Sequence, residues 1–253
     1  VAAHTHPLWL LVFGAAVGNG CPAEHRQYGR TFGAMIERLN SRQFHESDGL
    51  DDWRVLYGRA CAFFRADSFR DGVALVAAIG DLADAADHHP DIALRYHGVT
   101  VCLVTHEAGG LSVRDVELAR QISAAARVLN VTPDPSSVQQ VNVTVDAAVR
   151  QDVMPFWREL LGYRVDGEED LVDPQGRGPG LWFQQMEVPR GGRNRIHVDV
   201  AVPHDQAEAR VAAAIAAGGR LVTDQHAPAW WVLADSEGNE ACVATWMGRW
   251  WEE

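Results

Sequence analysis

The chain has 253 residues, of which 47% are hydrophobic and 22% charged, and its formal net charge is -12 at pH 7. This length exceeds that of one average domain and suits two, and the apolar fraction is sufficient for a core in each. The acidic balance provides no basic surface, so it argues against a nucleic-acid partner and against binding to an anionic membrane.

The first forty residues, 1–40, are expected to form an extension of uncertain structure outside the folded domains. Residues 7–17 are an apolar run, but no Lys or Arg precedes it and residues 18–20 are a poor context for signal-peptide cleavage. The run is also too short to span a bilayer. A targeting or membrane-interface segment is the alternative interpretation.

The spacing of the cysteines indicates a reducing compartment. Cys21, Cys61, Cys102 and Cys242 are far apart in the sequence and form no CxxC pair. This pattern is typical of free thiols and not of a disulfide framework or a zinc site. We therefore expect reduced cysteines and a cytoplasmic location.

Residues 41–130 are predicted to form the first domain, in the order strand, strand, helix, strand, helix. Apolar runs at residues 55–57 and 60–64 predict the first two strands. The hydrophobic spacing that follows predicts a helix over residues 69–87. The expected apolar face of this helix consists of Phe69, Val73, Val76 and Ala77.

The end of that helix and the start of the next are marked by specific residues. Pro90 disfavours a helical conformation at the residue before it, so the first helix should end near the pair His88 and His89. A β-rich run at residues 99–105 predicts a strand, and residues 112–115 resemble a capping box that opens the second helix. The apolar stripe of the second helix consists of Val116, Ala119, Ile122, Ala126 and Leu129.

Residues 131–138 concentrate turn-forming residues without periodicity, which predicts a linker. In residues 139–253 the order strand, helix, strands occurs twice, with helices predicted at 155–161 and 205–217. We therefore predict an α+β fold. The first domain is expected to have an antiparallel sheet with helices on one face, and the second to have paired βαβββ modules.

Three histidines and several carboxylates are concentrated in one short region of the first domain. Asp84 and His88 are four residues apart on the predicted helix, so the carboxylate should orient the imidazole. His89 is adjacent to His88, and His106 follows the next predicted strand. Histidine titrates at about 6.5 when unperturbed, so this region has the groups that an acid/base active site needs.

Other interpretations of the same residues remain open. A histidine at a helix end is often only a solvated or capping group. Three histidines and a water also form a known catalytic zinc site, although adjacent histidines seldom face the same ion. Asp115 is explained equally well as the acid of the capping box at the start of the second helix.

The first domain resembles a known enzyme family. Residues 44–125 are similar to the pterin-4a-carbinolamine dehydratases, also called 4a-hydroxytetrahydrobiopterin dehydratases. The motifs that carry the resemblance are His88-His89-Pro90-Asp91, Tyr96, Thr105-His106-Glu107, Gly110-Leu111-Ser112 and Arg114-Asp115. The resemblance implies dehydration of a 4a-hydroxytetrahydropterin to a quinonoid dihydropterin, with no metal and no other cofactor.

The resemblance also implies roles for individual residues. His88, His89 and His106 are the implied acid/base and binding imidazoles, and Asp84 is the implied orienting carboxylate. The residues implied to contact or support the substrate are Asp87, Thr105, Glu107, Arg114 and Asp115. The expected partner is a small-molecule pterin, and self-association into a homo-oligomer is implied as well.

Residues 139–246 resemble the glyoxalase-like branch of the vicinal oxygen chelate (VOC) superfamily. The motifs are Phe156-Trp157-Arg158-Glu159-Leu160-Leu161-Gly162-Tyr163, Ile196-His197-Val198-Asp199-Val200 and Asp235-Ser236-Glu237-Gly238-Asn239-Glu240. Metal-using members take ligands from four strands. Here His197 is one good ligand, the last position holds Cys242, and the first offers only Gln140 or Asn142, so we expect no metal site.

The leading hypothesis is therefore a dehydratase with an accessory glyoxalase-like domain. The second domain is expected to bind a ligand, to modulate the first domain or to aid assembly. One rival is a protein that binds a pterin or another small molecule without turnover. The other is lyase or dioxygenase chemistry located in the second domain.

Overall fold

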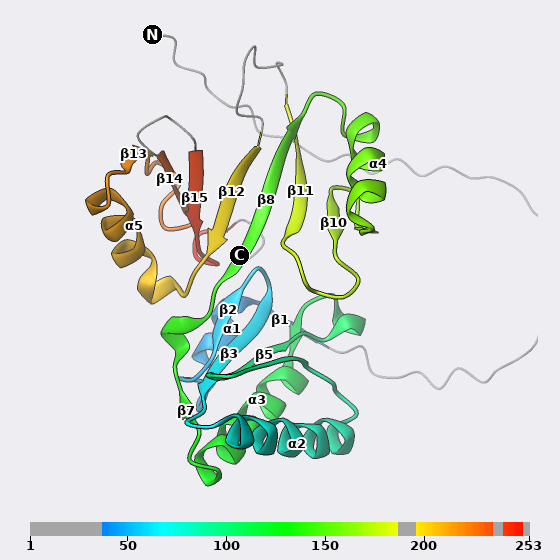
Figure 1. Cartoon of the computed structure of the whole chain (residues 1–253), viewed down its shortest axis with the longest axis vertical. Helices are drawn as coiled ribbons and strands as arrows, with labels where there is room; N and C mark the ends of the chain where they lie inside the picture. Colours follow the sequence, from blue (N-terminus) through cyan, green and yellow to red (C-terminus); the bar gives the residue numbers. More distant parts are fainter. Residues whose placement is uncertain (1–36, 187–195, 235–239, 250–253) are drawn as a thin grey trace, which may run out of the picture. The chain divides into compact units, whose positions relative to one another are not determined.

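The computed structural model describes residues 37–186, 196–234 and 240–249, and residues 36–253 belong to one compact unit. Residues 1–36 of the expected extension, and residues 235–239 of the last glyoxalase-like motif, lie outside the described residues. Two groups of elements are visible in Figure 1. We call the five-stranded sheet with its helices the N-terminal module and the eight-stranded sheet with its helices the C-terminal module.

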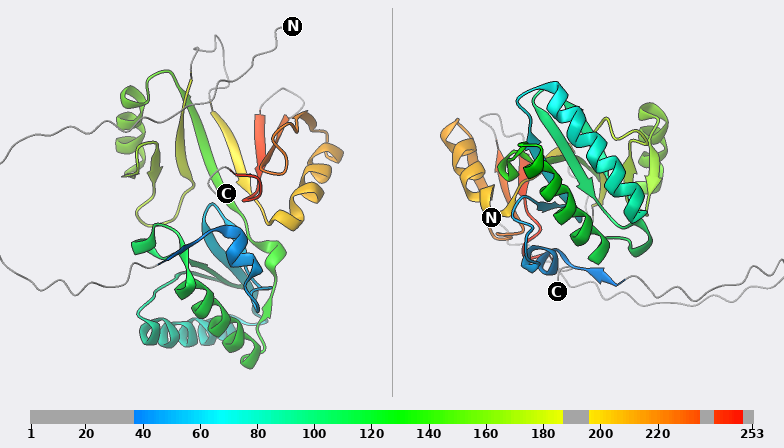
Figure 2. Two further views of the ribbon diagram at one scale, coloured as in Figure 1. Left: turned by 180° about the vertical axis from the view of Figure 1, so that it is seen from behind. Right: turned by 90° about the horizontal axis from the view of Figure 1, so that it is seen from below.

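The N-terminal module is built on an antiparallel sheet of order β2-β3-β5-β4, in which β7 also pairs with β3. Its elements are β1 (Arg38–Leu39), α1 (Ser41–Glu46), β2 (Arg54–Leu56), β3 (Arg59–Arg65), α2 (Phe69–Ala86), β4 (Asp91–Arg95), β5 (Gly98–Leu103), a 3-10 turn at His106–Ala108, β6 (Leu111–Ser112), α3 (Val113–Val128) and β7 (Thr132–Pro133). Helices α2 and α3 lie side by side along one face of the sheet (Figures 1 and 2). The predicted antiparallel sheet with helices on one face is confirmed.

Helix α2 buries a different face from the one predicted. Phe69 and Val73, which the periodicity placed in the core, are 49% and 45% exposed. The residues that α2 buries are Gly72, Leu75, Ile79 and Ala83. Gly72 shows why: a Cβ at this position would lie 2.7 Å from the Leu94 side chain, so the helix approaches the sheet at the face where a glycine permits close contact.

Helix α3 has the apolar stripe that its sequence predicts. Four of the five predicted residues, Val116, Ala119, Ile122 and Ala126, are buried, and Leu129 packs against the same core as a partly buried residue. Trp53 and Phe44 are fully buried in this core, and the Trp53 indole N–H donates to Ser123 Oγ at 3.1 Å. The core of the N-terminal module is therefore continuous from α1 to α3.

Several elements of the N-terminal module were not predicted, among them α1, β4 and β7. Helix α1 is short and is stabilised by a capping box between Asn40 and Gln43. Strand β4 directly follows Pro90 and pairs along its whole length with β5. The predicted linker at residues 131–138 contains β7 and a 3-10 turn, so part of it pairs with β3. The boundary between the two domains remains a prediction.

The C-terminal module consists of two βαβββ units, as predicted. Its elements are β8 (Gln140–Ala147), α4 (Arg150–Leu161), β9 (Arg164–Asp166), β10 (Asp170–Val172), β11 (Gly180–Gln185), β12 (Ile196–Ala201), α5 (Ala207–Ala216), β13 (Arg220–Thr223), β14 (Trp230–Ala234) and β15 (Glu240–Ala244). They form one sheet of order β13-β14-β15-β12-β8-β11-β10-β9. The units join through the antiparallel pair β8 and β12, and each closes with a parallel pair, β8–β11 or β12–β15.

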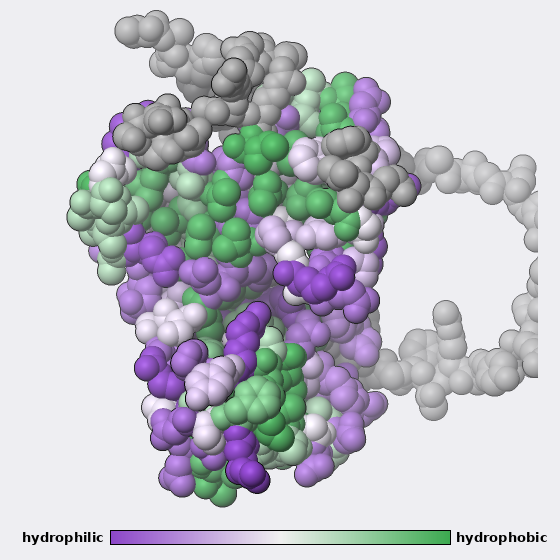
Figure 3. All heavy atoms as spheres, in the orientation of Figure 1, coloured by the Kyte–Doolittle hydropathy of each residue, from purple (hydrophilic) through white to green (hydrophobic). Residues whose placement is uncertain are grey.

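Alternation along the strands divides this sheet into two faces. Val145, Leu181 and Phe183 form a core that includes side chains of α4, and Val243 and Leu233 form a second core that includes side chains of α5. Residues at the alternate positions point to the opposite face. In the view of Figure 3, hydrophobic side chains gather at the surface over the strands of this module.

Helix α4 begins five residues earlier than predicted, at Arg150, so that Pro155 lies inside it. Proline is usual in the first turn of a helix, which is why the sequence indicated a start at this residue. The additional turn includes Val153 and Met154, which pack against the core beneath α4. Their burial offsets the loss of the backbone hydrogen bond that proline cannot donate.

The expectation of free thiols is wrong for two cysteines. Cys61 on β3 and Cys102 on β5 are directly paired across the sheet, and their sulfurs form a disulfide with a Cα–Cα distance of 4.3 Å. Cys242 is free and buried. Spacing in the sequence concealed the pair because 41 residues separate two positions that the strand register makes neighbours.

The two modules share a small hydrophobic core within the compact unit. Leu56 and Cys61 of the N-terminal module cluster with Val138 and with Ala201 of β12. An ion pair between Arg54 and Asp205, 2.6 Å apart, also joins residues of the two modules. No helix among the described residues is both long enough and apolar enough to cross a bilayer.

Candidate active site

The predicted histidine pair lies where helix α2 ends. Asp87 adopts the left-handed conformation, with φ 46° and ψ 42°, and turns the chain out of the helix. The next amide, that of His88, donates back to Ala83 O at 3.0 Å, which satisfies a carbonyl in the last turn. Pro90 follows and β4 begins, so His88 and His89 occupy a tight turn and point in different directions.

His88 is buried, with 6% of its surface exposed, and it is bonded to a carboxylate. Its Nε2 lies 2.8 Å from Asp115 Oδ1, and Asp115 is fully buried. Burying a carboxyl group is costly unless its oxygens form hydrogen bonds, and both oxygens of this one do. Its other oxygen, Oδ2, accepts from Thr105 Oγ1 at 2.6 Å and from the Ser112 amide at 2.7 Å.

Asp115 has the structural one of the two roles that the sequence left open, and its catalytic role remains a prediction. It is the acid of the capping box at the start of α3, with Ser112 as the N-cap residue. It also joins the end of α2 to the end of β5 through His88 and Thr105. The Thr105 and Ser112 hydroxyls, 2.7 Å apart, complete this network, and we call the four side chains His88, Asp115, Thr105 and Ser112 the buried network.

Asp84 pairs with a different histidine from the one predicted. Its Oδ1 lies 3.0 Å from Nε2 of His89, and the side chains of both residues are mostly exposed, at 83% and 61%. The expected pairing with His88 requires a continuous helix through residue 88, whereas α2 ends at Ala86. The left-handed residue that follows turns His88 into the core and leaves His89 beside Asp84.

Arg114 connects the remaining predicted residues. Its guanidinium donates to the backbone oxygen of Asp87, and lies 3.5 Å from that of Ala86, at the C-terminus of α2. A cation is favoured at this end of a helix, where unpaired carbonyls carry partial negative charge. The same guanidinium is 4.0 Å from Glu107 Oε2, so it links the end of α2 to the 3-10 turn that carries His106.

His106 opens that turn and is exposed. The turn is closed by a bridge between Thr105 and Gly110, and Gly109 takes the left-handed conformation that the reversal requires. Within the part of the chain that the structure describes, the His106 imidazole has no hydrogen-bond partner. It is therefore available to a ligand, as the exposed His89 is.

Hydrogen bonds thus connect every segment that carries a predicted site residue. Thr105 precedes His106 and belongs to the buried network, and His88, in the same network, precedes His89. Sequence reasoning missed Ser112 as a member, although the capping-box pattern had singled it out as the start of α3. The arrangement provides two exposed imidazoles, one with a carboxylate partner, on a rigid hydrogen-bonded base.

A second polar cluster lies on the sheet of the C-terminal module. Ligand atoms of His197, Asp199 and Cys242 all lie within 4.8 Å of one another. Asp199 accepts a hydrogen bond from the Thr144 hydroxyl. Burial, with the Asp199 carboxylate as a further cause, raises the pKa of the Cys242 thiol far above its usual range. We call these four residues the Asp199 cluster.

The Asp199 cluster does not fit a divalent metal ion in this arrangement. A metal ion binds the thiolate form of cysteine, and the burial of Cys242 opposes the loss of its proton. The Asp199 carboxylate already accepts a hydrogen bond from the Thr144 hydroxyl, and a metal ion would compete with that bond. We assign no metal-dependent step to these residues.

The same two regions are similar to known protein families. A family described as "Pterin 4 alpha carbinolamine dehydratase" matches residues 37–125, and one described as "Glyoxalase-like domain" matches residues 142–244. A protein of Nocardia farcinica named "Putative pterin-4-alpha-carbinolamine dehydratase" is 45% identical over 78 residues, which are 31% of this chain and 82% of that protein. A protein of the same name from Halobacterium salinarum is 44% identical over 88 residues, which are 34% of this chain and 94% of that protein.

Solved structures also match parts of the chain, and each match covers less than half of it. A transcriptional coactivator/pterin dehydratase from Brucella melitensis is 28% identical, with 36% of this chain and 99% of that chain covered and a TM-score of 0.34. A glyoxalase/bleomycin resistance protein/dioxygenase superfamily member from Vibrio splendidus is 14% identical, covers 43% of this chain and 99% of its own, and has a TM-score of 0.29.

Proposed function

Because the chain belongs to the pterin 4a-carbinolamine dehydratase family and also has a glyoxalase-like domain, we propose that its N-terminal module removes water from a 4a-hydroxytetrahydropterin. The product is a quinonoid dihydropterin. The names of the relatives describe a dehydratase, and the relatives match only this module. The C-terminal module is then an accessory domain.

The reaction requires two proton transfers and no change in oxidation state. A base takes the proton from N5 of the pterin, and the electron pair of that N–H bond forms the double bond between N5 and C4a. The C4a–O bond breaks, and an acid protonates the departing hydroxyl, which leaves as water. One group must therefore be unprotonated and another protonated at the same pH, which two imidazoles with different surroundings satisfy.

We assign these transfers to the two exposed imidazoles. His89 has the Asp84 carboxylate at 3.0 Å, while the His106 imidazole has no hydrogen-bond partner among the described residues. The two imidazoles therefore have different surroundings, as an acid and a base in one reaction require. His88 is 6% exposed, so we place it as a positioning residue that holds the turn through Asp115.

The substrate-binding set follows from the same geometry. Arg114 fixes the Asp87 carbonyl and lies near Glu107, and these two residues are close in the chain to the exposed imidazoles of His89 and His106. Carboxylates are suitable acceptors for the N–H groups at the polar edge of a pterin. Thr105 and Asp115 contribute through the buried network. The observation that carries the proposal is this network, which ties the turn at His89 to the turn at His106.

The test is the turnover of chemically generated 4a-hydroxytetrahydropterin by the full chain. Positioned acid/base groups contribute about a hundred- to ten-thousand-fold in rate, so His89→Ala and His106→Ala should each lower kcat by about that factor. His97→Ala is the matched control, because His97 is exposed in the same module but lies at the opposite end of strand β4. Asp84→Asn should lower kcat less than His89→Ala, because the imidazole remains.

Either of two results would contradict the assignment. Full activity of both histidine variants would remove their roles, and a large loss in the His97→Ala control would show that the assay reports general damage. Binding of the pterin with no rate enhancement over solution would favour the rival, a binding protein without turnover. The family resemblance also supports self-association, which sedimentation of the full chain measures directly.

A further inference from the structure

The disulfide between Cys61 and Cys102 joins the two central strands of the N-terminal sheet, β3 and β5. The two residues are directly opposite each other, and their Cα–Cα distance of 4.3 Å is typical of the closely spaced pairs in an antiparallel ladder. The neighbours Ala60 and Ala62 belong to the core that includes side chains of α2 and α3. Because side chains alternate along a strand, the disulfide lies on the other face of the sheet.

The strand register places the disulfide near both turns of the candidate active site. Asp91 on β4 is directly paired with Cys102, and His89 is two residues before Asp91. Thr105 of the buried network is three residues after Cys102, and His106 follows it. The covalent link is therefore made at the end of the sheet from which both exposed imidazoles emerge.

A second connection on the same face is weaker than the disulfide. The Arg59 guanidinium donates to the Asp91 carboxylate, which joins β3 to β4, the two strands on either side of β5. The Asp91 side chain is 81% exposed, and ion pairs in contact with solvent contribute little to stability. The covalent bond is therefore the stronger of the two connections at this end of the sheet.

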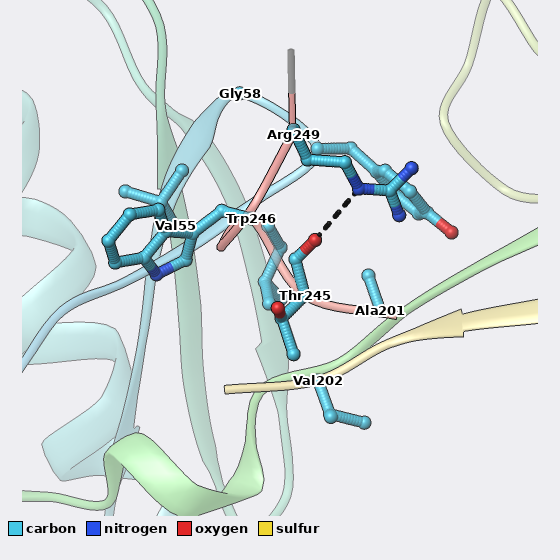
Figure 4. A pocket seen from close by; sticks show the side chains of 9 residues that line it. Val55, Gly58, Ala201, Val202, Thr245, Trp246 and Arg249 are labelled. Carbon is cyan, nitrogen blue, oxygen red and sulfur yellow. Dashed lines mark hydrogen bonds between the residues drawn. The ribbon is translucent and has the colours of Figure 1, made fainter. Parts of the chain in front are cut away.

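The two sulfurs of the disulfide differ in their access to solvent. Cys61 is 4% exposed and packs in the small core between the modules, which also contains Ala201. Figure 4 shows Ala201 and Gly58 of the β2–β3 turn lining one small cavity, so the C-terminal module covers this part of the sheet. Cys102 is partly exposed. Thiol–disulfide exchange requires a thiolate to reach one sulfur, and Cys102 is the one that offers access.

We propose that the Cys61–Cys102 disulfide is a redox-sensitive brace of the candidate active site, and that its reduction by a dithiol lowers the activity of that site. This regulation rests on the proposed dehydratase function. It adds a second level of control to a site whose chemistry involves no change in oxidation state.

The reduction is a two-step exchange. A thiolate of the dithiol attacks Cys102 Sγ, the S–S bond breaks, and its electron pair leaves on Cys61 Sγ, which takes up a proton. The second thiol of the reductant then attacks the mixed disulfide and releases Cys102, which also takes up a proton. The dithiol is oxidised to its own disulfide by two electrons and supplies both protons.

Reduction removes the constraint between β3 and β5 at this position. A disulfide holds its sulfurs about 2 Å apart, whereas two thiols are not held at that distance. The end of β5 can then shift relative to β3, and Thr105 and His106 move with it. A misplacement of about 1 Å can cost about a hundredfold in rate, and the backbone ladder and the Arg59 ion pair remain, so we expect a smaller loss of at least about fivefold.

The experiment titrates the full chain with mixtures of reduced and oxidised dithiothreitol. Alkylation and mass spectrometry give the fraction of Cys61 and Cys102 that is joined, and turnover of 4a-hydroxytetrahydropterin is measured on the same samples. Turnover should fall by at least about fivefold as the bond is reduced, and should return on reoxidation. The double variant Cys61→Ala and Cys102→Ala should have the low activity under both conditions.

Cys242→Ala is the matched control, because Cys242 is a buried cysteine that is free. This variant should respond to the dithiol as the wild type does. Amide hydrogen exchange gives a readout that does not depend on activity. Peptides covering residues 87–93 and 103–110 should exchange faster in the reduced protein, whereas those of α5, residues 207–216, should not change.

Four results would overturn the proposal. These are cysteines that are not joined in the oxidised protein, a bond that the dithiol does not reduce in the folded chain, turnover and exchange that are the same in both states, and a double variant that still responds to the dithiol. If the oxidised chain shows no turnover at all, the proposed function fails, and the exchange of residues 87–93 and 103–110 then decides separately whether the disulfide braces this site.

Discussion

Asp115 shows how much of this site depends on a single buried side chain. It accepts hydrogen bonds from an imidazole, a hydroxyl and a backbone amide, and all of these partners are buried or belong to turns around the site. A carboxylate is suited to this position because its two oxygens offer about four acceptor sites. Thr105, which the family resemblance implies to contact or support the substrate, and Ser112, which occurs in one of its motifs, are structural partners of this group.

The residue-scale prediction concerns the stability that Asp115 provides. Asp115→Ala should lower the free energy of unfolding by about 3–5 kcal/mol, because it leaves several buried donors without an acceptor. Asp115→Asn should cost less, since its amide oxygen still accepts from the Ser112 amide. Urea unfolding followed by tryptophan fluorescence measures both. Glu117→Ala is the control on the same helix and should change stability by less than about 0.5 kcal/mol.

A loss below 1 kcal/mol in Asp115→Ala would show that the buried network does not support the fold. The site would then be held by other contacts, such as those of Arg114 with the end of α2. Activity gives an independent readout, because Asp115→Asn retains the packing and alters the partner of His88. Its effect should appear in kcat, since the turn that carries His89 loses its anchor.

At the scale of elements, helix α2 shows that a hydrophobic pattern alone does not decide which residues are buried. Its sequence permits two apolar faces, one through Phe69 and Val73 and another through Leu75 and Ile79. The structure buries the second face, where Gly72 allows close packing on the sheet. Periodicity identified the helix and its length correctly, but two faces with similar hydrophobicity cannot be ranked without the partner surface.

This difference predicts contrasting effects of truncation on α2. Leu75→Ala and Ile79→Ala should each destabilise the protein by about 2–5 kcal/mol, because both side chains are completely buried. Val73→Ala should cost less than about 1 kcal/mol, since Val73 is 45% exposed. Thermal and urea unfolding of the three variants test the assignment. Equal losses at residues 73 and 75 would mean that the helix buries both faces, for instance against another copy of the chain.

At the scale of the whole molecule, the contact between the two modules includes an unusual group of aromatic and basic side chains. His45 of α1 stacks on Trp246 with ring centroids 5.3 Å apart, and it also contacts His204 at 4.9 Å. The Trp246 indole donates to His204 Nδ1 at 3.1 Å, and the Val55 amide donates to His45 Nε2 at 3.3 Å. His45 must be neutral to accept that hydrogen bond.

Its surroundings also keep His45 neutral. The pKa of His45 is lowered from 6.5 to about 4, mainly by burial and also by the neighbouring His204 and Arg54, while Asp205 acts in the opposite direction. The unfolded chain takes up a proton near pH 6.5, whereas the folded protein does not do so until about pH 4. The stability that the neutral His45 contributes is therefore fully present above pH 6.5 and is lost progressively as the pH falls toward 4.

The whole-molecule prediction is a loss of stability in acid that depends on His45. Between pH 7 and pH 4 the wild type should lose up to about 3 kcal/mol relative to His45→Gln, because glutamine accepts the Val55 hydrogen bond without titrating. Urea unfolding at several pH values measures the difference, with His97→Gln as the exposed control. The comparison with a variant is necessary because burial and Asp166 raise the pKa of Asp170 to about 6, which has the opposite effect on stability.

A difference between wild type and His45→Gln that does not change with pH would contradict the assignment. His97→Gln retains His45, so it should lose as much stability in acid as the wild type does. A loss in His97→Gln that is as small as the loss in His45→Gln would show that removing any histidine has this effect, and would contradict the assignment to His45.

Local patterns in the sequence were sufficient for much of the architecture. The capping box at Ser112, the turn at Pro90 and the periodicity of α3 each depend on residues that are neighbours in the chain, so their physical cause is visible in the sequence. The order strand, helix, three strands, repeated twice, likewise predicted the C-terminal module. The predicted site residues were named from their resemblance to a known family, and Ser112 of the buried network was not among them.

Only the tertiary structure decided which of these groups meet. Asp84 contacts His89 because the helix ends two residues before His88, and Cys61 contacts Cys102 because two strands align in one register. The burial of Asp115 and the packing of Leu56 with Ala201 of the other module depend on segments that are distant in the sequence. The sequence by itself determined the elements and the chemical groups, since these follow from local interactions. Pairing, burial and the contact between the modules arise from packing, which no local pattern encodes.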